Sequence, residues 1–337
     1  MNINCMILLI FFLFYDNIIP TSGFIYNYYE KVKCSYYECC NDDYIPQNAL
    51  ELHRLLSIKM FGQKIATDSI SRAVYAHTNA DNTPKALAMS FHGTSGTGKT
   101  FVANMIGETF YKKGYQSQYF HFINGRSDLT LESESERYKE MLQKKIIQGL
   151  LECPKSLFIF DEIDSMPAGV LNVLVPFLDY GKPRLWSPHS LEKRVETRKA
   201  IFIFITNAGS EQIVERAINL RDSGKLRNDT TLADYEDVIS VQAFSENGGF
   251  HKSDIINNNL IDHYVPFLPL EVQHIKLCID AAFRIYGSIP TIKQIDEVLS
   301  HLKFGPEPLN LYSQSGCKRI ETKVASIVYK RRFHNEL

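Results

Sequence analysis

The chain has 337 residues, 45% of them hydrophobic, which is enough for two domains that each bury a core. Its formal net charge is −1 at pH 7 and no basic stripe runs along the sequence, so nucleic acid is not an expected partner.

An apolar run from Cys5 to Tyr15 lies near the N-terminus and is followed by small residues up to Gly23. The run is shorter than the about 20 apolar residues of a membrane-spanning helix, and it predicts a cleaved signal peptide over residues 1–23. A buried N-terminal strand or helix is the alternative. The chain ends with His334-Asn335-Glu336-Leu337, which is similar to an endoplasmic reticulum (ER) retrieval signal and predicts a tail at 332–337.

Cysteine and tyrosine are frequent in residues 24–46, which we expect to form an N-terminal extension held by disulfides in an oxidising lumen. Of the seven cysteines, Cys5 lies in the predicted signal peptide, and the six that remain are Cys34, Cys39, Cys40, Cys153, Cys278 and Cys317. Six cysteines allow 15 complete pairings, and spacing alone does not choose among them. One glycosylation sequon begins at Asn228, in a polar stretch that predicts a surface loop.

From about residue 47, short apolar runs alternate with amphipathic helical patterns, which is typical of a parallel α/β sheet. The predicted strands are Ala86–His92, Tyr119–Ile123, Leu157–Phe160, Ile201–Ile205 and Tyr264–Phe267, and the helical segments between them include 98–112, 133–149, 167–178 and 210–221. Residues 269–331 have helical periodicity and no convincing strand. The sequence therefore predicts a large α/β domain over 47–268 and a smaller α-helical domain over 269–331.

The strongest local motif is Gly93-Thr94-Ser95-Gly96-Thr97-Gly98-Lys99-Thr100, a GxxxxGK[ST] pattern between a predicted strand and a predicted helix. Its glycines let the loop turn its backbone N–H groups toward phosphate, and the helix N-terminus adds a favourable dipole. Lys99 is expected to reach the terminal phosphates of ATP, and the Thr100 hydroxyl to bind Mg²⁺. A glycine-rich turn without a ligand is the alternative.

Polar residues follow two later strands. Asp161 and Glu162 end the strand that begins at Leu157, where Asp161 is expected to hold Mg²⁺ and Glu162 to activate the water that attacks the γ-phosphate. A solvated loop start is the alternative. Asn207 follows the strand Ile201–Ile205 and is expected to orient the same water. The three strand ends together predict an AAA+ ATPase.

Several stretches resemble the torsin family: YYECC at 36–40, KMFGQ at 59–63, FIFDEIDSMPAGVLNVLVPFLDY at 158–180, FITNAG at 204–209, IDHYVPFLPLEVQHI at 261–275 and SGCK at 315–318. The resemblance covers about residues 34–331. It implies an ATPase of the ER and nuclear-envelope lumen, in which Asn207 is the first nucleotide sensor and Lys318, in a helical lid, is the second. It also implies that residues 61–63 contact the adenine.

The same resemblance implies that Cys278 and Cys317 form a disulfide beside Lys318. We predict that the redox poise of the lumen makes this bond reversible and that it tunes nucleotide affinity. We also predict a structural disulfide between Cys34 and Cys153. A small buried hydrophobe is the alternative for Cys317.

The chain departs from the ATPases it resembles at several positions. Thr100 stands where torsins usually have asparagine, which favours ordinary Mg²⁺ binding, and we assign no role to the surface segment 181–199. Leu260 takes the place of the arginine with which ring-forming Clp-type ATPases reach a neighbouring γ-phosphate. Residues 124–136 contain no aromatic residue to grip a threaded chain.

The predicted function is ATP-driven remodelling of protein or membrane-associated complexes by a homo- or hetero-oligomeric ring. The resemblance implies that a type II membrane activator, with a lumenal domain resembling lamina-associated polypeptide 1, supplies the missing arginine. The alternative is a nucleotide-gated binding module with little hydrolysis of its own. An autonomous Clp-like disaggregase is disfavoured by Leu260 and by the missing pore aromatic.

Overall fold

The computed structural model describes residues 32–180, 184–187 and 190–336. The predicted signal peptide at 1–23, Leu337 of the predicted retrieval signal and parts of the 181–199 segment lie outside these residues. No helix within the described ranges is both long and apolar enough to cross a membrane.

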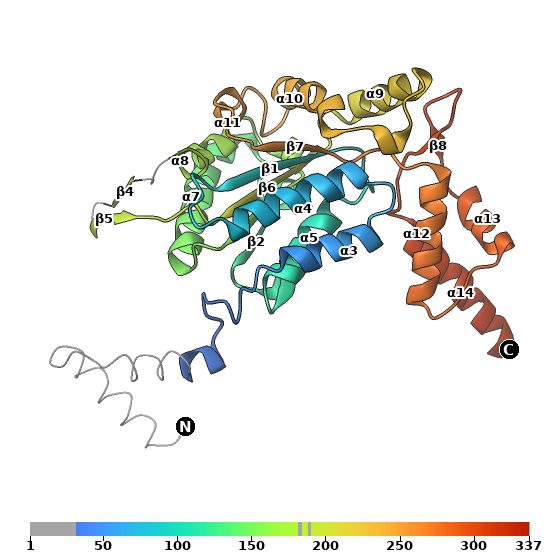
Figure 1. Ribbon diagram of the computed structural model, residues 1–337, viewed down its shortest axis with the longest axis horizontal. Helices are drawn as coiled ribbons and strands as arrows, with labels where there is room; N and C mark the ends of the chain where they lie inside the picture. Colours follow the sequence, from blue (N-terminus) through green and yellow to red (C-terminus); the bar gives the residue numbers. More distant parts are fainter. Residues whose placement is uncertain (1–31, 181–183, 188–189, 337) are drawn as a thin grey trace.

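A five-stranded sheet forms the centre of the larger domain (Figure 1). In their order across the sheet the strands are β2 (Phe120–Asn124), β3 (Leu157–Asp161), β6 (Ile201–Thr206), β1 (Leu87–His92) and β7 (His263–Pro266). All neighbouring pairs are parallel, so the carboxyl ends of the strands lie along one edge. The five predicted strands and the α/β class are therefore confirmed, with strand ends shifted by about one residue.

Two layers of helices cover the sheet, and alternate strand residues face each layer because side chains in a strand alternate between its faces. Ile159 and Ile203 pack with the helices α3, α4 and α5, whereas Phe158 and Phe202 pack on the opposite face with α7, α9 and α10. On that second face the Phe158 and Phe202 rings stack with their centroids 5.0 Å apart. The central strands β3 and β6 are buried along their whole length, which explains why they are continuous apolar runs that end in one polar residue, whereas the edge strand β2 is partly exposed.

The helices of the larger domain are α3 (Ala49–Lys59), α4 (Lys64–Asn79), α5 (Lys99–Phe110), α6 (Gly125–Asp128), α7 (Ser135–Glu152), α8 (Val175–Leu178), α9 (Ser210–Asp222), α10 (Glu236–Ser245) and α11 (Asp254–Asn257). Short 3-10 helices are η1 (Gly114–Gln116), η2 (Glu132–Glu134), η3 (Ile163–Ser165), η4 (Val170–Leu174), η5 (Arg227–Asp229) and η6 (Leu232–Asp234). Within the 181–199 segment, β4 (Arg184–Ser187) and β5 (Ser190–Arg194) form an antiparallel pair.

The smaller domain lies at one end of the sheet and consists mainly of α12 (Val272–Ile285), α13 (Ile292–Ser300) and α14 (Ile320–Glu336) (Figure 1). We call it the lid. Its own core includes Ile279, Phe283 and Val324. The sequence predicted no strand here, but β8 (Phe304–Gly305) pairs with β9 (Tyr312–Ser313). Two residues a strand are too few to produce an alternating pattern. The helix α14 includes residues 332–336, where the sequence predicted a tail.

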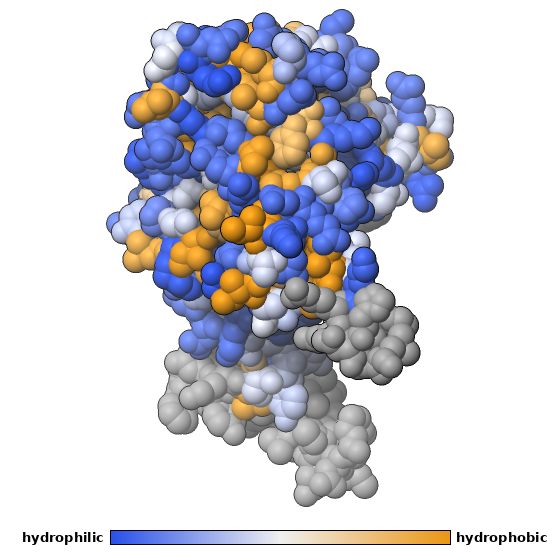
Figure 2. All heavy atoms as spheres, turned by 90° about the vertical axis from the view of Figure 1, so that its right-hand side faces the viewer, coloured by the Kyte–Doolittle hydropathy of each residue, from blue (hydrophilic) through white to orange (hydrophobic). Residues whose placement is uncertain are grey.

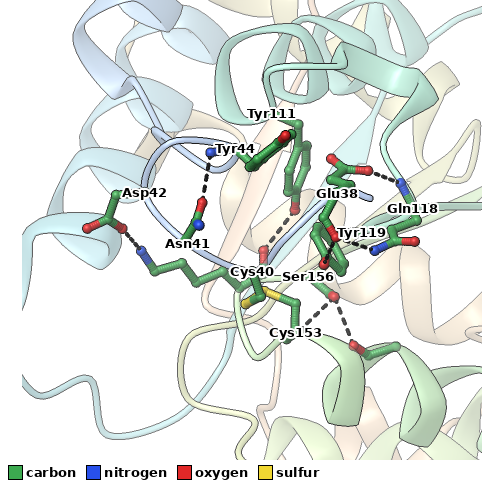
Figure 3. The surroundings of a disulfide bond; sticks show 12 residues. Glu38, Cys40, Asn41, Asp42, Tyr44, Tyr111, Gln118, Tyr119, Cys153 and Ser156 are labelled. Atoms are coloured by element: carbon green, nitrogen blue, oxygen red, sulfur yellow. Dashed lines mark hydrogen bonds and ion pairs between the residues drawn. A yellow bond between two sulfur atoms is a disulfide. The ribbon is translucent and has the colours of Figure 1, made fainter. Parts of the chain in front are cut away.

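Disulfides hold the N-terminal extension, but not in the predicted pairing. Cys34 bonds to Cys39, and Cys40 bonds to Cys153 at the end of α7 (Figure 3). The predicted Cys34–Cys153 bond is therefore wrong. The reason is local, because the chain is helical through residue 36 and then turns back, which brings the Cα atoms of Cys34 and Cys39 to 5.4 Å. Cys40 is then the residue that faces Cys153.

A buried carboxylate also anchors the extension. Glu38 accepts a hydrogen bond from Ser117 Oγ at 2.6 Å. It accepts a second one from the backbone N–H of Gln118 at 2.9 Å (Figure 3). Its backbone carbonyl accepts a hydrogen bond from the hydroxyl of Tyr119 at 3.0 Å. The extension is thus fixed to the segment that enters β2 by polar contacts as well as by the disulfide.

Candidate functional site

A cavity of about 510 Å³ lies between the carboxyl edge of the sheet and the lid. Its walls come from the loop after β1, the ends of β3 and β6, the helix α12 and the turn before α14. The volume is in the range of small-molecule sites, and the edge of the sheet is where open α/β folds bind ligands.

The predicted phosphate loop forms one wall of this cavity. It joins β1 to α5, as the motif requires, and residues 95–100 line the cavity. The hydroxyl of Thr97 donates to the carbonyl of Thr94 at 2.8 Å, which closes the loop on itself. We refer to residues 93–100 as the P-loop.

Lys99 is a buried cation at the base of the P-loop. Its Nζ donates to the carbonyl oxygens of Gly93 and Thr94 and, at 3.0 Å, to Oδ1 of Asn207. Burial lowers the pKa of Lys99 to about 8, although the nearby carboxylates of Asp161 and Asp164 act in the opposite direction. An ammonium that is held by neutral oxygens and stripped of water fits a site for anionic phosphate.

The residues expected to bind Mg²⁺ lie together. The hydroxyl of Thr100 donates to Oδ2 of Asp161 at 2.8 Å, and Oδ1 of Asp161 accepts from the backbone N–H of Glu162 at 2.8 Å. A hydroxyl and a carboxylate are oxygen ligands of the kind that Mg²⁺ prefers, and this ion usually completes its shell with water and phosphate oxygens. The pair therefore fits Mg²⁺. The described residues contain no cluster of three or more His, Cys, Asp or Glu side chains that could hold a metal ion.

Glu162 lines the cavity and has a left-handed backbone conformation with φ of 53°. Its Oε2 is 2.9 Å from Nε of Arg126, at the start of α6. Sequence reasoning missed Arg126. Only the order of the strands could have indicated it. The strands β2 and β3 are neighbours, with Asn124 in register with Asp161. The residues that follow the two strands, Arg126 and Glu162, are therefore close in space.

Asp164 is a second residue that sequence reasoning missed. Its Oδ1 accepts from the backbone N–H of Asn207 at 3.3 Å and from the Thr206 hydroxyl at 3.2 Å, so it fixes the end of β6 against the end of β3. Asp164 also lines the cavity. The sequence does show Asp164 as the third carboxylate of the DEID stretch at 161–164. We had assigned roles only to the first two, Asp161 and Glu162.

The lid forms the remaining wall of the cavity, and three predicted site residues lie on it. Lys318 is exposed and lines the cavity, as do Cys278 and Cys317. The two cysteines form the predicted disulfide, with Cα atoms 6.1 Å apart. Asn228 is exposed in η5 and is not among the residues that line the cavity.

The residues predicted to contact adenine divide between two places. Phe61 lines the cavity, whereas Gly62 and Gln63 line a neighbouring pocket of about 350 Å³. Gln63 is buried, and its side-chain amide donates to the carbonyls of Thr97 at 3.2 Å and Leu268 at 2.8 Å. Gln63 therefore braces the P-loop against the segment that leads into the lid.

Comparison with known proteins agrees with this arrangement. The sequence profile "Torsin" matches residues 34–160, and the profile "Torsin-1A, C-terminal domain" matches residues 270–326. The chain is 35% identical over 305 residues to a torsin-like protein of Drosophila melanogaster, which covers 89% of this chain and 87% of the relative. It is 32% identical over 296 residues to Torsin-3A of Mus musculus, which covers 86% of this chain and 75% of the relative.

The fold is similar to that of a solved structure, the S. cerevisiae Hsp104-ADP complex, with a TM-score of 0.60 and 17% sequence identity. The match covers 87% of this chain and 49% of the Hsp104 chain, so the present chain spans about half of that protein's length. At this level of identity the likeness concerns the fold alone. The identity and coverage of the torsin relatives show more: the chain belongs to the torsin family of AAA+ ATPases.

Proposed function

We propose that the protein binds and hydrolyses ATP in the lumen of the ER and nuclear envelope and uses the energy to remodel protein or membrane-associated complexes. One observation carries the proposal. Lys99, Thr100, Asp161, Glu162 and Asn207, which come from the P-loop and two strand ends, meet at one cavity under a lid that contributes Lys318. Family membership and three disulfides support a lumen of the secretory pathway.

Each of these residues has a role in ATP hydrolysis. Lys99 neutralises the terminal phosphates, and Thr100 with Asp161 would hold Mg²⁺, which adds positive charge at the phosphate oxygens. Glu162 accepts a proton from the attacking water, and Asn207, fixed by Asp164, orients that water. Lys318 approaches the γ-phosphate from the lid. Positioning and charge neutralisation are the main contributions a protein makes to phosphoryl transfer.

We propose that the arginine which completes this site comes from another protein. Leu260 is 3% exposed and packs in the core, and its carbonyl accepts a hydrogen bond from Lys85 Nζ at 3.0 Å. Lys85 is also paired with Asp262 at 2.7 Å, so the segment is fixed on both sides of Ile261. An arginine supplied in trans is worth about 10³–10⁵ in rate. The proposed source is a membrane activator with a lumenal domain resembling lamina-associated polypeptide 1.

The surface of the lid supports association with a further chain. On the face where the lid is turned toward the viewer, hydrophobic atoms gather in the middle, between hydrophilic areas (Figure 2). Ile289 and Ile292, in and beside the segment that joins α12 to α13, are 76% and 79% exposed. Exposed apolar side chains in a group are typical of protein–protein contacts. We propose that these side chains contact either a neighbouring subunit of a ring or the activator.

Steady-state ATP turnover tests the proposal, measured for the purified protein alone and with the lumenal domain of the activator. We expect slow turnover alone and a large increase with the activator. Brisk turnover by the protein alone would contradict the need for a partner. The alternative, a nucleotide-gated binding module, predicts that a Glu162→Gln variant keeps its cellular role although hydrolysis is blocked, whereas a remodelling ATPase loses it.

A further inference from the structure

The turn that carries Cys317 lies directly on the P-loop. The backbone N–H of Cys317 donates to the carbonyl of Gly96 at 3.0 Å, which joins the lid to the phosphate loop without any side chain. Gly96 and Gly316 both have left-handed backbones, with φ of 79° and 51°. A Cβ atom on either glycine would lie closer than 3.0 Å to backbone atoms of the opposite segment. The two backbones are therefore in contact, and only glycine fits on each side.

The turn is also fixed to the lid. The backbone N–H of Ser313 donates to the carbonyl of Leu270 at 2.8 Å, and the Ser313 hydroxyl donates to the carbonyl of Gly316 at 3.2 Å. The disulfide attaches Cys317 to Cys278 on α12. A change in the P-loop must therefore either move the lid with it or break the hydrogen bond to Cys317.

A single peptide unit connects this contact to the cavity. The bond between Gly96 and Thr97 is trans, so the Thr97 N–H is directed opposite to the carbonyl that accepts from Cys317. Thr97 lines the cavity. A phosphate that accepts a hydrogen bond from this N–H would fix the orientation of the peptide plane, and with it the carbonyl that binds the lid.

Lys318 offers a different route between nucleotide and lid. Its exposed side chain lines the cavity and would contact a group that reaches it there, which in the proposed function is the γ-phosphate. The backbone contact needs no γ-phosphate, because the P-loop is filled by ADP as well as by ATP. The two routes therefore differ in which nucleotide operates them.

We propose that Gly96, Gly316 and Cys317 form a backbone joint that transmits filling of the P-loop by a β-phosphate to the lid, independently of Lys318 and of the γ-phosphate. The two glycines are positioning residues, since they act through the peptide units that they allow to approach. This inference rests on the proposed function, in which the cavity binds adenine nucleotides.

Hydrogen exchange at the amides of residues 315–320 tests the joint, measured by mass spectrometry on the oxidised protein with ADP, with AMP and without nucleotide. We expect ADP to slow exchange at the Cys317 amide by about tenfold, because the hydrogen bond to Gly96 is then held closed. AMP, which lacks the β-phosphate, should have little effect. The Lys318→Ala variant should respond to ADP as the wild type does.

A matched pair of glycine variants provides a second test of the joint. Gly316→Ala places a methyl group against Gly96, whereas Gly287→Ala, in the same lid, also has a left-handed φ of 68° but meets nothing within 4 Å. We expect the ADP response to be lost in Gly316→Ala and kept in Gly287→Ala. Protection that appears only with ATP and disappears in Lys318→Ala would overturn the joint, as would a full ADP response in Gly316→Ala.

Calorimetric binding of ADP to the wild type separates this inference from the proposed function. If ADP does not bind, the proposed function fails. If ADP binds and exchange at Cys317 is unchanged, the joint alone is wrong. If Gly316→Ala does not fold, the joint is still tested by comparing exchange at the Cys317 amide of the wild type with ADP and with AMP.

Discussion

Nε of Arg126 lies 2.9 Å from Oε2 of Glu162, so the carboxylate proposed as the general base, which lines the cavity, is engaged in an ion pair. The pair joins the segment after β2 to the segment after β3, and the Arg126 side chain is 68% exposed whereas that of Glu162 is 28% exposed. The ion pair holds the carboxylate toward α6. We expect Glu162 to exchange Arg126 for the attacking water during turnover.

The first prediction is that Arg126→Gln raises activator-stimulated ATP turnover by about 1.4- to fivefold, with nucleotide affinity unchanged. A partly exposed ion pair contributes about 0.2–1 kcal/mol, and this is the amount by which the barrier should fall. The control is Arg137→Gln, which removes an ion pair between Arg137 on α7 and Glu134 in η2. A fall in turnover for Arg126→Gln alone would mean that Arg126 holds Glu162 in its productive position.

The second prediction concerns pH. Because burial lowers the pKa of Lys99 to about 8, the lysine of the free protein loses its charge above that pH, while bound phosphate favours the charged form. The dissociation constant for ATP should be nearly constant up to pH 8 and rise toward about tenfold per unit above it. Calorimetric titrations from pH 7 to 9.5 measure this. A constant affinity across the range would contradict it.

The third prediction is that an arginine cannot simply be restored at position 260. Leu260→Arg forces a charge into the core and should lower the free energy of unfolding by about 3 kcal/mol or more, without producing partner-free turnover. Leu226→Arg is the control, because Leu226 is 69% exposed and the change should stay within about 0.5 kcal/mol. Urea unfolding gives both values. A stable Leu260→Arg variant that hydrolyses ATP alone would show that this backbone can present an arginine.

The fourth prediction separates the two disulfides of the extension. Cys40–Cys153 joins residues 113 apart, and Cys34–Cys39 residues 5 apart. In the chain-entropy account, the first stabilises by about 5 kcal/mol and the second by about 2 kcal/mol. We therefore expect Cys40→Ser/Cys153→Ser to lower the unfolding midpoint more than Cys34→Ser/Cys39→Ser. Peptide mapping without reduction checks the pairing itself, and a peptide linking Cys34 to Cys153 would contradict it.

Much of the fold followed from local patterns in the sequence. The central strands were the easiest to predict, because both of their faces are buried and each is an apolar run such as Ile201–Ile205. The P-loop, Asp161 and Glu162 were found because their residue types stand at fixed offsets from strand ends. Arg126 could not be found in this way, since its partner is 36 residues away and only the order of strands brings β2 beside β3.

The cysteine pairing shows the same limit. Sequence allowed 15 complete pairings, and the choice depended on where the chain turns after residue 36, which leaves Cys39 facing Cys34. The contact between Gly96 and Gly316 could not be predicted from the sequence either, because it depends on how the lid is placed on the sheet domain. Motifs identify residues that act on phosphate, whereas contacts between segments require the fold.

The central claim is that these residues form an ATP-hydrolysing site in which Glu162 is the general base. The most direct measurement is steady-state ATP turnover by wild type and Glu162→Gln, each with a saturating concentration of the activator's lumenal domain, with Glu211→Gln on the exposed face of α9 as control. The account predicts a loss of about 10²–10⁴-fold for Glu162→Gln with ATP binding retained, and no change for Glu211→Gln. Wild-type turnover by Glu162→Gln, or no turnover by the activated wild type, would contradict it.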